Sequence, residues 1–139
     1  MNDTILALLG YISWTLVLLV WLAVYRTKLV MSRQVAPNQF QSDGSNCPAF
    51  GQRLTRAQSN CVESFVFIGG LMLLALATNS AVITDGLALI LLAARLGQSI
   101  THILSTSNLA VQIRFAFFLV QVGICIYWLF NFATKFIGV

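Results

Sequence analysis

The chain has 139 residues, of which 58% are hydrophobic and only 9% are charged. Soluble domains carry about 25% charged residues, and eight basic and four acidic side chains are too few to cover a soluble globule of this size. The high hydrophobicity also excludes a disordered chain. These proportions are those of a polytopic membrane protein. The net charge of +4 is therefore interpreted through its position in loops rather than as an affinity for nucleic acid, and no nucleic-acid partner is expected.

The first apolar segment, residues 4–25, contains no charged residue and is long enough for a helix that crosses a bilayer, which needs about 20 residues. It follows Asp3 and lacks the basic start of a cleaved signal peptide, so we expect a retained helix. Three further spans are predicted at residues 57–78, 86–104 and 115–134. The expected fold is an all-α, integral membrane four-helix bundle in a single domain, residues 1–139.

The connection between the first two spans, residues 26–56, is long and contains both prolines of the chain. Four spans place both termini on one side of the membrane and this connection on the other. Basic loop residues mark the cytoplasmic side, so both termini are expected to be non-cytoplasmic, in a bacterial inner membrane or the endoplasmic reticulum. The basic residues on the side of the long connection are Arg26, Lys28, Arg33, Arg53, Arg56 and Arg114.

Three ionisable residues, Glu63, Arg95 and His102, lie inside predicted spans, where each costs about 2.5–3.5 kcal/mol to insert. Helical spacing gives each of them polar neighbours on the same face. The resulting stripes are Arg53, Arg56, Asn60 and Glu63 on the second helix, Arg95, Gln98 and His102 on the third, and Arg114 and Gln121 on the fourth.

The three stripes converge on the cytoplasmic half of the bundle and suit a polar, mostly anionic ligand that enters from the cytoplasm. Arg95 lies deeper, and its long side chain is expected to reach towards Glu63. The two residues then form either part of the site or a structural ion pair that fixes helix register. Taken singly, Arg53 and Arg56 are typical interfacial anchors, His102 a typical helix-end residue, and Gln121 a typical interhelical hydrogen-bonding residue.

The three cysteines, Cys47, Cys61 and Cys125, have no metal-ligand spacing and are odd in number, so free thiols and no metal site are expected.

The segment from Arg56 to Glu63, RAQSNCVE, resembles the RAxxNxxE signature of the MAPEG family, the membrane-associated proteins in eicosanoid and glutathione metabolism. Its RAQxNCxE form is especially similar to the leukotriene C synthase branch. Gln112-Ile113-Arg114 resembles the QLR-type start of the fourth helix in that family. The resemblance covers nearly the whole chain and implies a homotrimer of four-helix subunits, with glutathione bound between neighbours.

The resemblance also assigns roles to residues. It implies that Arg56, Gln58, Asn60 and Glu63 hold the peptide and that Arg114 stabilises the glutathione thiolate. It further implies that a basic residue after the first helix, either Arg26 or Arg33, joins the site. The full set of predicted glutathione-binding residues is Arg53, Arg56, Gln58, Asn60, Glu63, Gln98 and His102.

The chain departs from the eicosanoid enzymes at several positions. It has His102 where they carry a tyrosine, Gln98 where they carry a tyrosine or histidine, and Phe115 where the prostaglandin enzyme has a serine. The leading hypothesis is therefore a glutathione-dependent membrane transferase or peroxidase that acts on a lipophilic electrophile, rather than a specific eicosanoid reaction. The alternatives are a non-catalytic scaffold or regulator of the same fold, and a small transporter or channel.

Overall fold

The computed structural model describes residues 2–41 and 44–138, and within these ranges the chain forms four long α-helices and no strand. This confirms the predicted all-α, four-helix fold. Each of the four helices is long and apolar enough to cross a membrane. They are α1 (Asp3–Met31), α2 (Ala49–Ala77), α3 (Ala81–Leu104) and α4 (Asn108–Ile137).

The helices extend beyond the apolar spans from which they were predicted. With 29 residues, α2 is about 43 Å long, against about 30 Å for a bilayer core. It begins at Ala49 rather than near residue 57, and α1 continues to Met31. The connection between α1 and α2 is therefore residues 32–48 instead of 26–56. Polarity marks where a helix leaves the membrane, but Arg, Lys and Gln are good helix formers and do not end it.

The ends of α1 and α2 have the same backbone geometry. Arg33 adopts a left-handed conformation (φ 62°), and the N–H of Gln34 donates to the carbonyl of Leu29 at 2.9 Å. Asn79 (φ 55°) ends α2 in the same way. This Schellman arrangement satisfies carbonyl groups that the last helical turn leaves unpaired.

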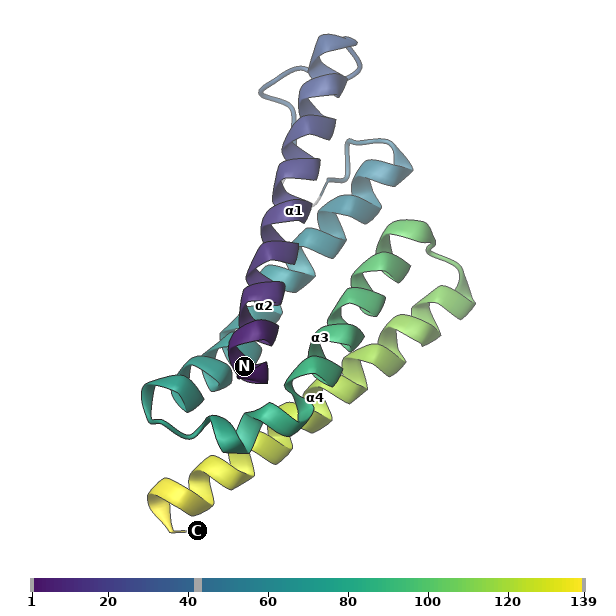
Figure 1. Cartoon of the computed structure of the whole chain (residues 1–139). Coiled ribbons are helices and arrows are strands. Elements are labelled where there is room, and N and C mark those ends of the chain that lie inside the picture. The colour runs from purple at the N-terminus through teal and green to yellow at the C-terminus, as the bar shows by residue number, and fades with distance from the viewer. Residues whose placement is uncertain (1, 42–43, 139) are drawn as a thin grey trace.

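The connections divide between two ends of the bundle (Figure 1). The α1–α2 connection and the α3–α4 link lie at one end, whereas the α2–α3 turn, the start of α1 and the end of α4 lie at the other. The α3 helix packs against each of the other three helices, and α4 lies mainly along α3. The polar stripes of α2, α3 and α4 are thus brought towards the end that carries the long connection.

Small residues allow α3 to approach its neighbours closely. A Cβ atom on Gly97 would lie 2.7 Å from the ring of Phe117 on α4, and one on Gly10 of α1 would lie 2.7 Å from Leu92. Close approach matters here because lipid tails are as apolar as the side chains, so packing rather than water exclusion drives helix association in a membrane.

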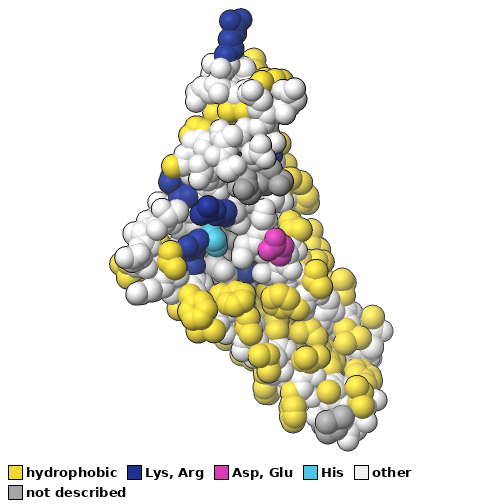
Figure 2. All heavy atoms as spheres, turned by 180° about the vertical axis from the view of Figure 1, so that it is seen from behind, with side chains coloured by type: hydrophobic (Ala, Val, Ile, Leu, Met, Phe, Trp, Pro, Cys, Tyr) yellow, Lys and Arg dark blue, Asp and Glu magenta, His cyan; other side chains and the backbone are white. Residues whose placement is uncertain are grey.

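Much of the outer surface is apolar. Large hydrophobic side chains are exposed on every helix, including Val20 (60% exposed), Val66 (80%) and Phe130 (64%). In Figure 2 this apolar surface covers one end and the middle of the visible face, and basic side chains gather beyond it. Soluble monomers rarely expose continuous apolar patches of this kind, so the surface is suited to lipid or to other subunits.

Candidate functional site

The candidate site lies on the face where basic side chains surround the single histidine of the chain (Figure 2). The α2 helix contributes its second to fifth turns, α3 its last turns and α4 its first turns. The predicted stripes are therefore close to one another, but the structure divides their residues into two groups. One group faces outwards without partners among the residues that the structure describes, and the other is hydrogen-bonded inside the bundle.

Arg56 and Glu63 belong to the outward group. Both side chains are exposed, and Gln58 between them is half-buried. None of the three forms a side-chain hydrogen bond or ion pair with another described residue. Arg56 and Glu63 lie two helical turns apart, about 10 Å along α2. A cation and an anion at this separation are free to bind a small ligand with charges at both ends.

Arg53, one turn before Arg56, has a different environment. Its Nε donates to the carbonyl oxygen of Ile103 at 2.8 Å, and its guanidinium lies 5.9 Å from the ring centre of Phe50. Ile103 is next to the last residue of α3, where helical carbonyls lack intrahelical donors. Arg53 was predicted to bind ligand. In the structure its Nε caps α3 and joins α3 to α2, and ligand binding by its other nitrogen atoms stays a prediction.

Arg95 is the centre of the buried group, with 1% of its surface exposed. Its Nε donates to Oε1 of Gln121 on α4 at 2.9 Å, and its Nη1 donates to Oδ1 of Asn60 at 2.5 Å. Its Nη2 donates to Oγ of Ser64 at 3.2 Å. All these acceptors are neutral, so the guanidinium is held by oriented dipoles rather than by a counter-ion.

The expected approach of Arg95 to Glu63 is wrong. Asn60 and Ser64 are four residues apart on α2 and share the face that meets α3, so Glu63 turns outwards. The sequence offered a signal for Ser64, because it follows Asn60 at i+4. Charge attraction alone predicts the carboxylate of Glu63 as the partner of Arg95, rather than the neighbouring hydroxyl of Ser64.

The buried group continues into two glutamines. Nε2 of Gln121 donates to Oε1 of Gln98 at 2.8 Å, and these side chains are 1% and 3% exposed. The predicted interhelical role of Gln121 is thus confirmed. Gln98, predicted as a ligand-binding residue, has its oxygen committed to α4 and retains only its amide nitrogen for other partners.

Arg114 and His102 are in direct contact. Nη1 of Arg114 lies 2.8 Å from Nδ1 of His102, and both side chains are half-buried. Arginine has N–H donors and no acceptor, so the Nδ1 atom must accept and the ring proton must lie on Nε2. Two residues predicted separately for the site therefore form one unit between the end of α3 and the second turn of α4.

The two alternatives for a further basic residue occupy different places. Arg26 lies inside α1, with its guanidinium 5.1 Å from the ring centre of Phe40 and 3.4 Å from Oγ1 of Thr55. Thr55 precedes Arg56, so Arg26 lies level with the outward group. Arg33 is exposed beyond the end of α1, about 10 Å farther along the helix axis.

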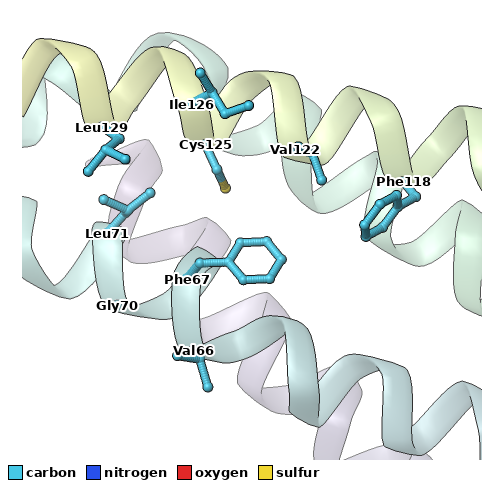
Figure 3. A pocket seen from close by; sticks show the side chains of 9 residues that line it. All are labelled: Val66, Phe67, Gly70, Leu71, Phe118, Val122, Cys125, Ile126 and Leu129. Atoms are coloured by element: carbon cyan, nitrogen blue, oxygen red, sulfur yellow. The ribbon is translucent and has the colours of Figure 1, made fainter.

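An apolar groove of about 480 Å³ runs between α2 and α4 (Figure 3). Val66 and Phe67 line it from α2, and Phe118, Cys125 and Leu129 line it from α4. Val66 is one helical turn after Glu63, so the groove begins where the outward polar group ends. Sequence reasoning missed this groove, because it depends on how far α4 lies from α2 rather than on any motif.

The described cysteines are free and buried, and the described part of the chain holds no cluster of three histidine, cysteine or acidic residues for a metal ion.

The sequence matches the MAPEG family over residues 4–134. The chain belongs to the MAPEG family. No curated protein and no solved structure shows significant similarity to it. The family includes glutathione-dependent transferases among other members, and its membership together with the four apolar helices makes this chain a multi-pass integral membrane protein. The RAQSNCVE segment that carries the family resemblance holds Arg56 and Glu63, the two outward charges of α2 that have no partner in the described part of the chain.

The contrast between Arg53 and Arg56 gives a stability test. Arg53→Ala removes a charged hydrogen bond to Ile103 and should lower the free energy of unfolding by about 1.5–3 kcal/mol. Arg56→Ala removes an exposed side chain without a described partner and should change it by less than about 0.5 kcal/mol. Unfolding in mixed micelles without added ligand measures both. Equal losses in the two variants would contradict the structural role of Arg53.

Proposed function

We propose that the protein is a glutathione-dependent membrane transferase or peroxidase that acts on a lipophilic electrophile. The observation that carries this proposal is the outward pair Arg56 and Glu63, unpartnered in the described chain, within the MAPEG signature and at the end of an apolar groove. A charged peptide and a lipophilic molecule can thereby occupy adjoining sites. The site is proposed to open towards the cytoplasm for glutathione and towards the lipid for the electrophile.

Glutathione carries two carboxylates, an ammonium group, two amides and a thiol. We assign a carboxylate to Arg56, because a guanidinium matches a carboxylate with two parallel hydrogen bonds. The ammonium group is assigned to Glu63, and the amides to Gln58 and to the free amide nitrogen of Asn60. Arg26 is preferred to Arg33 as the further basic residue, since it lies level with Arg56.

Arg114 is the proposed catalytic residue. A fixed cation beside a thiol lowers the thiol pKa and favours the nucleophilic thiolate, and arginine stays protonated under all relevant conditions. In the transferase reaction the thiolate sulfur forms a bond to the electrophilic carbon, and the leaving group departs with the displaced electron pair. In the peroxidase reaction the thiolate attacks the terminal oxygen of a hydroperoxide, and the O–O bond breaks to give an alcohol after protonation. A second glutathione then reduces the sulfenic acid to glutathione disulfide and water.

A homotrimer is part of the proposal. Glu63 is a carboxylate on the outer surface of a membrane helix, next to exposed apolar residues such as Val62 and Val66. Such a group facing lipid is costly, so a neighbouring subunit or a bound ligand must cover it. In the trimer Arg114 of one subunit would meet the sulfur of glutathione held by α2 of the next.

A non-catalytic scaffold is the second candidate. Asn60 and Gln98, two predicted ligand-binding residues, already form hydrogen bonds inside the chain. In this alternative the signature is retained for packing. A transporter or channel has less support, because the polar groups collect at one end of the bundle and the groove between α2 and α4 is apolar.

Mutation of Arg114 separates chemistry from binding. Arg114→Ala should raise the thiol pKa of bound glutathione by about 1 unit or more and slow conjugation at least tenfold, with a smaller change in affinity. Ultraviolet titration of the bound thiolate measures the pKa, and calorimetry measures affinity. Arg56→Ala is the matched control and should weaken binding about tenfold or more. An unchanged thiol pKa in Arg114→Ala would refute activation by this residue.

The trimer predicts a concentration-dependent site. Detergent-corrected mass measurement should give three copies of the chain, and glutathione should bind only to that species. A bulky substitution on the exposed face of α2, Val62→Trp, should shift the population towards monomer. The same change at Val82, which is 83% exposed at the start of α3, should not. A monomer that binds glutathione as tightly as the trimer would contradict a site between subunits.

The orientation is proposed from the basic residues, with the α1–α2 connection in the cytoplasm. The native thiols are buried, so introduced cysteines are needed. Asn38→Cys, in the connection, should be labelled by a membrane-impermeant reagent only from the cytoplasmic side, and Ala77→Cys only from the other side. The wild-type chain supplies the background signal. The reverse pattern of labelling would overturn the proposed orientation.

A further inference from the structure

Arg95 and Arg114 each bond to polar side chains of neighbouring helices, and these bonds determine which atoms those neighbours can offer to a ligand. An arginine side chain has five N–H donors and no acceptor. Any amide or imidazole that bonds to it must therefore use an oxygen or an unprotonated nitrogen. The remaining polar atom of that neighbour is then necessarily a donor.

Arg95 orients the amide of Gln98 through the amide of Gln121, which lies between them. Arg95 takes the oxygen of Gln121 at 2.9 Å, so the nitrogen of Gln121 faces Gln98 and must donate to its oxygen at 2.8 Å. The amide nitrogen of Gln98 has no acceptor among the described residues. Gln98 as a whole is only 3% exposed, but this nitrogen is not among the described polar atoms that are fully covered by protein and lack a partner. A donor of this kind, on an otherwise buried side chain, points to a ligand.

Asn60 and His102 are oriented by direct hydrogen bonds from the two arginines. Arg95 takes the oxygen of Asn60 at 2.5 Å and leaves its amide nitrogen free. Arg114 takes Nδ1 of His102 at 2.8 Å and leaves the N–H at Nε2. No sequence motif contains this information, because it follows from which atoms meet across the three helices.

We infer that Arg95 and Arg114 set the hydrogen-bond polarity of the site, so that Asn60, Gln98 and His102 present N–H donors only to the ligand. This inference rests on the proposed function for the identity of the ligand. It restricts this side of the site to groups that only accept, namely carboxylates, carbonyl oxygens and the thiolate. The ammonium group of glutathione cannot accept a hydrogen bond from these N–H donors, so it must lie towards Glu63.

A distant substitution tests the inference without altering the ligand-facing residues. In Gln121→Glu the carboxylate cannot donate to Gln98, so Gln98 must rotate its amide and present an oxygen to the ligand. Glutathione affinity should fall about tenfold or more, because an acceptor would then face an acceptor. Calorimetry on the detergent-solubilised full chain measures the affinity.

The new negative charge needs its own control. Ser64→Asp places a carboxylate against the same guanidinium, at the position of its Nη2 partner, and leaves the bond between Gln121 and Gln98 unchanged. It should keep the affinity within about threefold of wild type. If Gln121→Glu binds as wild type does, or if Ser64→Asp loses as much affinity as Gln121→Glu, polarity is not the cause and the inference fails.

A second measurement needs no ligand. The chain has a single histidine, so nitrogen-15 labelling of histidine reports on His102 alone. At neutral pH the spectrum should show an unprotonated Nδ1 and a protonated Nε2, and Arg114→Met should give a mixture of the two tautomers. A protonated Nδ1 in the wild type, or no change in Arg114→Met, would overturn the inference.

The two arms keep this inference separate from the proposed function. If the wild-type protein binds no glutathione, the proposed function fails, and the histidine spectrum still decides the polarity of His102. If glutathione binds and Arg56→Ala weakens it while Gln121→Glu does not, the proposed function stands and the polarity inference is wrong.

Discussion

The buried guanidinium of Arg95 is the interaction on which the arrangement of the helices depends. From α3 it bonds to Asn60 and Ser64 on α2 and to Gln121 on α4, and it lies 5.9 Å from the ring centre of Tyr11 on α1. A buried charge without these partners would cost several kcal/mol, so each helix is held where it supplies its dipole or ring. How far polar side chains extend into the bundle, and the register of α2 against α3, follow from this one side chain.

This constraint also explains why α2 presents two kinds of polar residue. Asn60 and Ser64 are used to solvate Arg95, whereas Arg56 and Glu63 lie on the adjoining face and remain without described partners. Rotation of α2 by one residue would bring Glu63 to the position of Ser64 and remove its carboxylate from the outer surface. The exposure of Arg56 and Glu63 therefore follows from the inward orientation of Asn60 and Ser64. This relation couples the stability of the bundle to the geometry of the proposed binding surface.

Helix number, helix order and the clustering of polar residues were predictable from the sequence, because apolar length and 3.6-residue periodicity determine them. The helix ends were not, since polar segments such as residues 49–56 continue a helix after it leaves the membrane. The partner of Arg95 was mispredicted because charge attraction suggested Glu63, while the helix rotation that excludes it is a property of packing. The roles of Arg53 and of the groove lined by Phe67 and Phe118 likewise depend on distances between helices.

The position of the groove relative to the polar group bears on how the proposed enzyme would handle two dissimilar molecules. Glu63 and Val66 are neighbours on α2, so the change from charged to apolar surface takes place within one helical turn. A water-soluble peptide and a lipid-soluble molecule can then meet without either crossing an unfavourable medium, because the helix itself spans the boundary. Arg114, held by His102 at the end of α3, lies on the polar side of that boundary. In the proposed reaction, its charge would act on the thiol of glutathione without being exposed to the hydrocarbon.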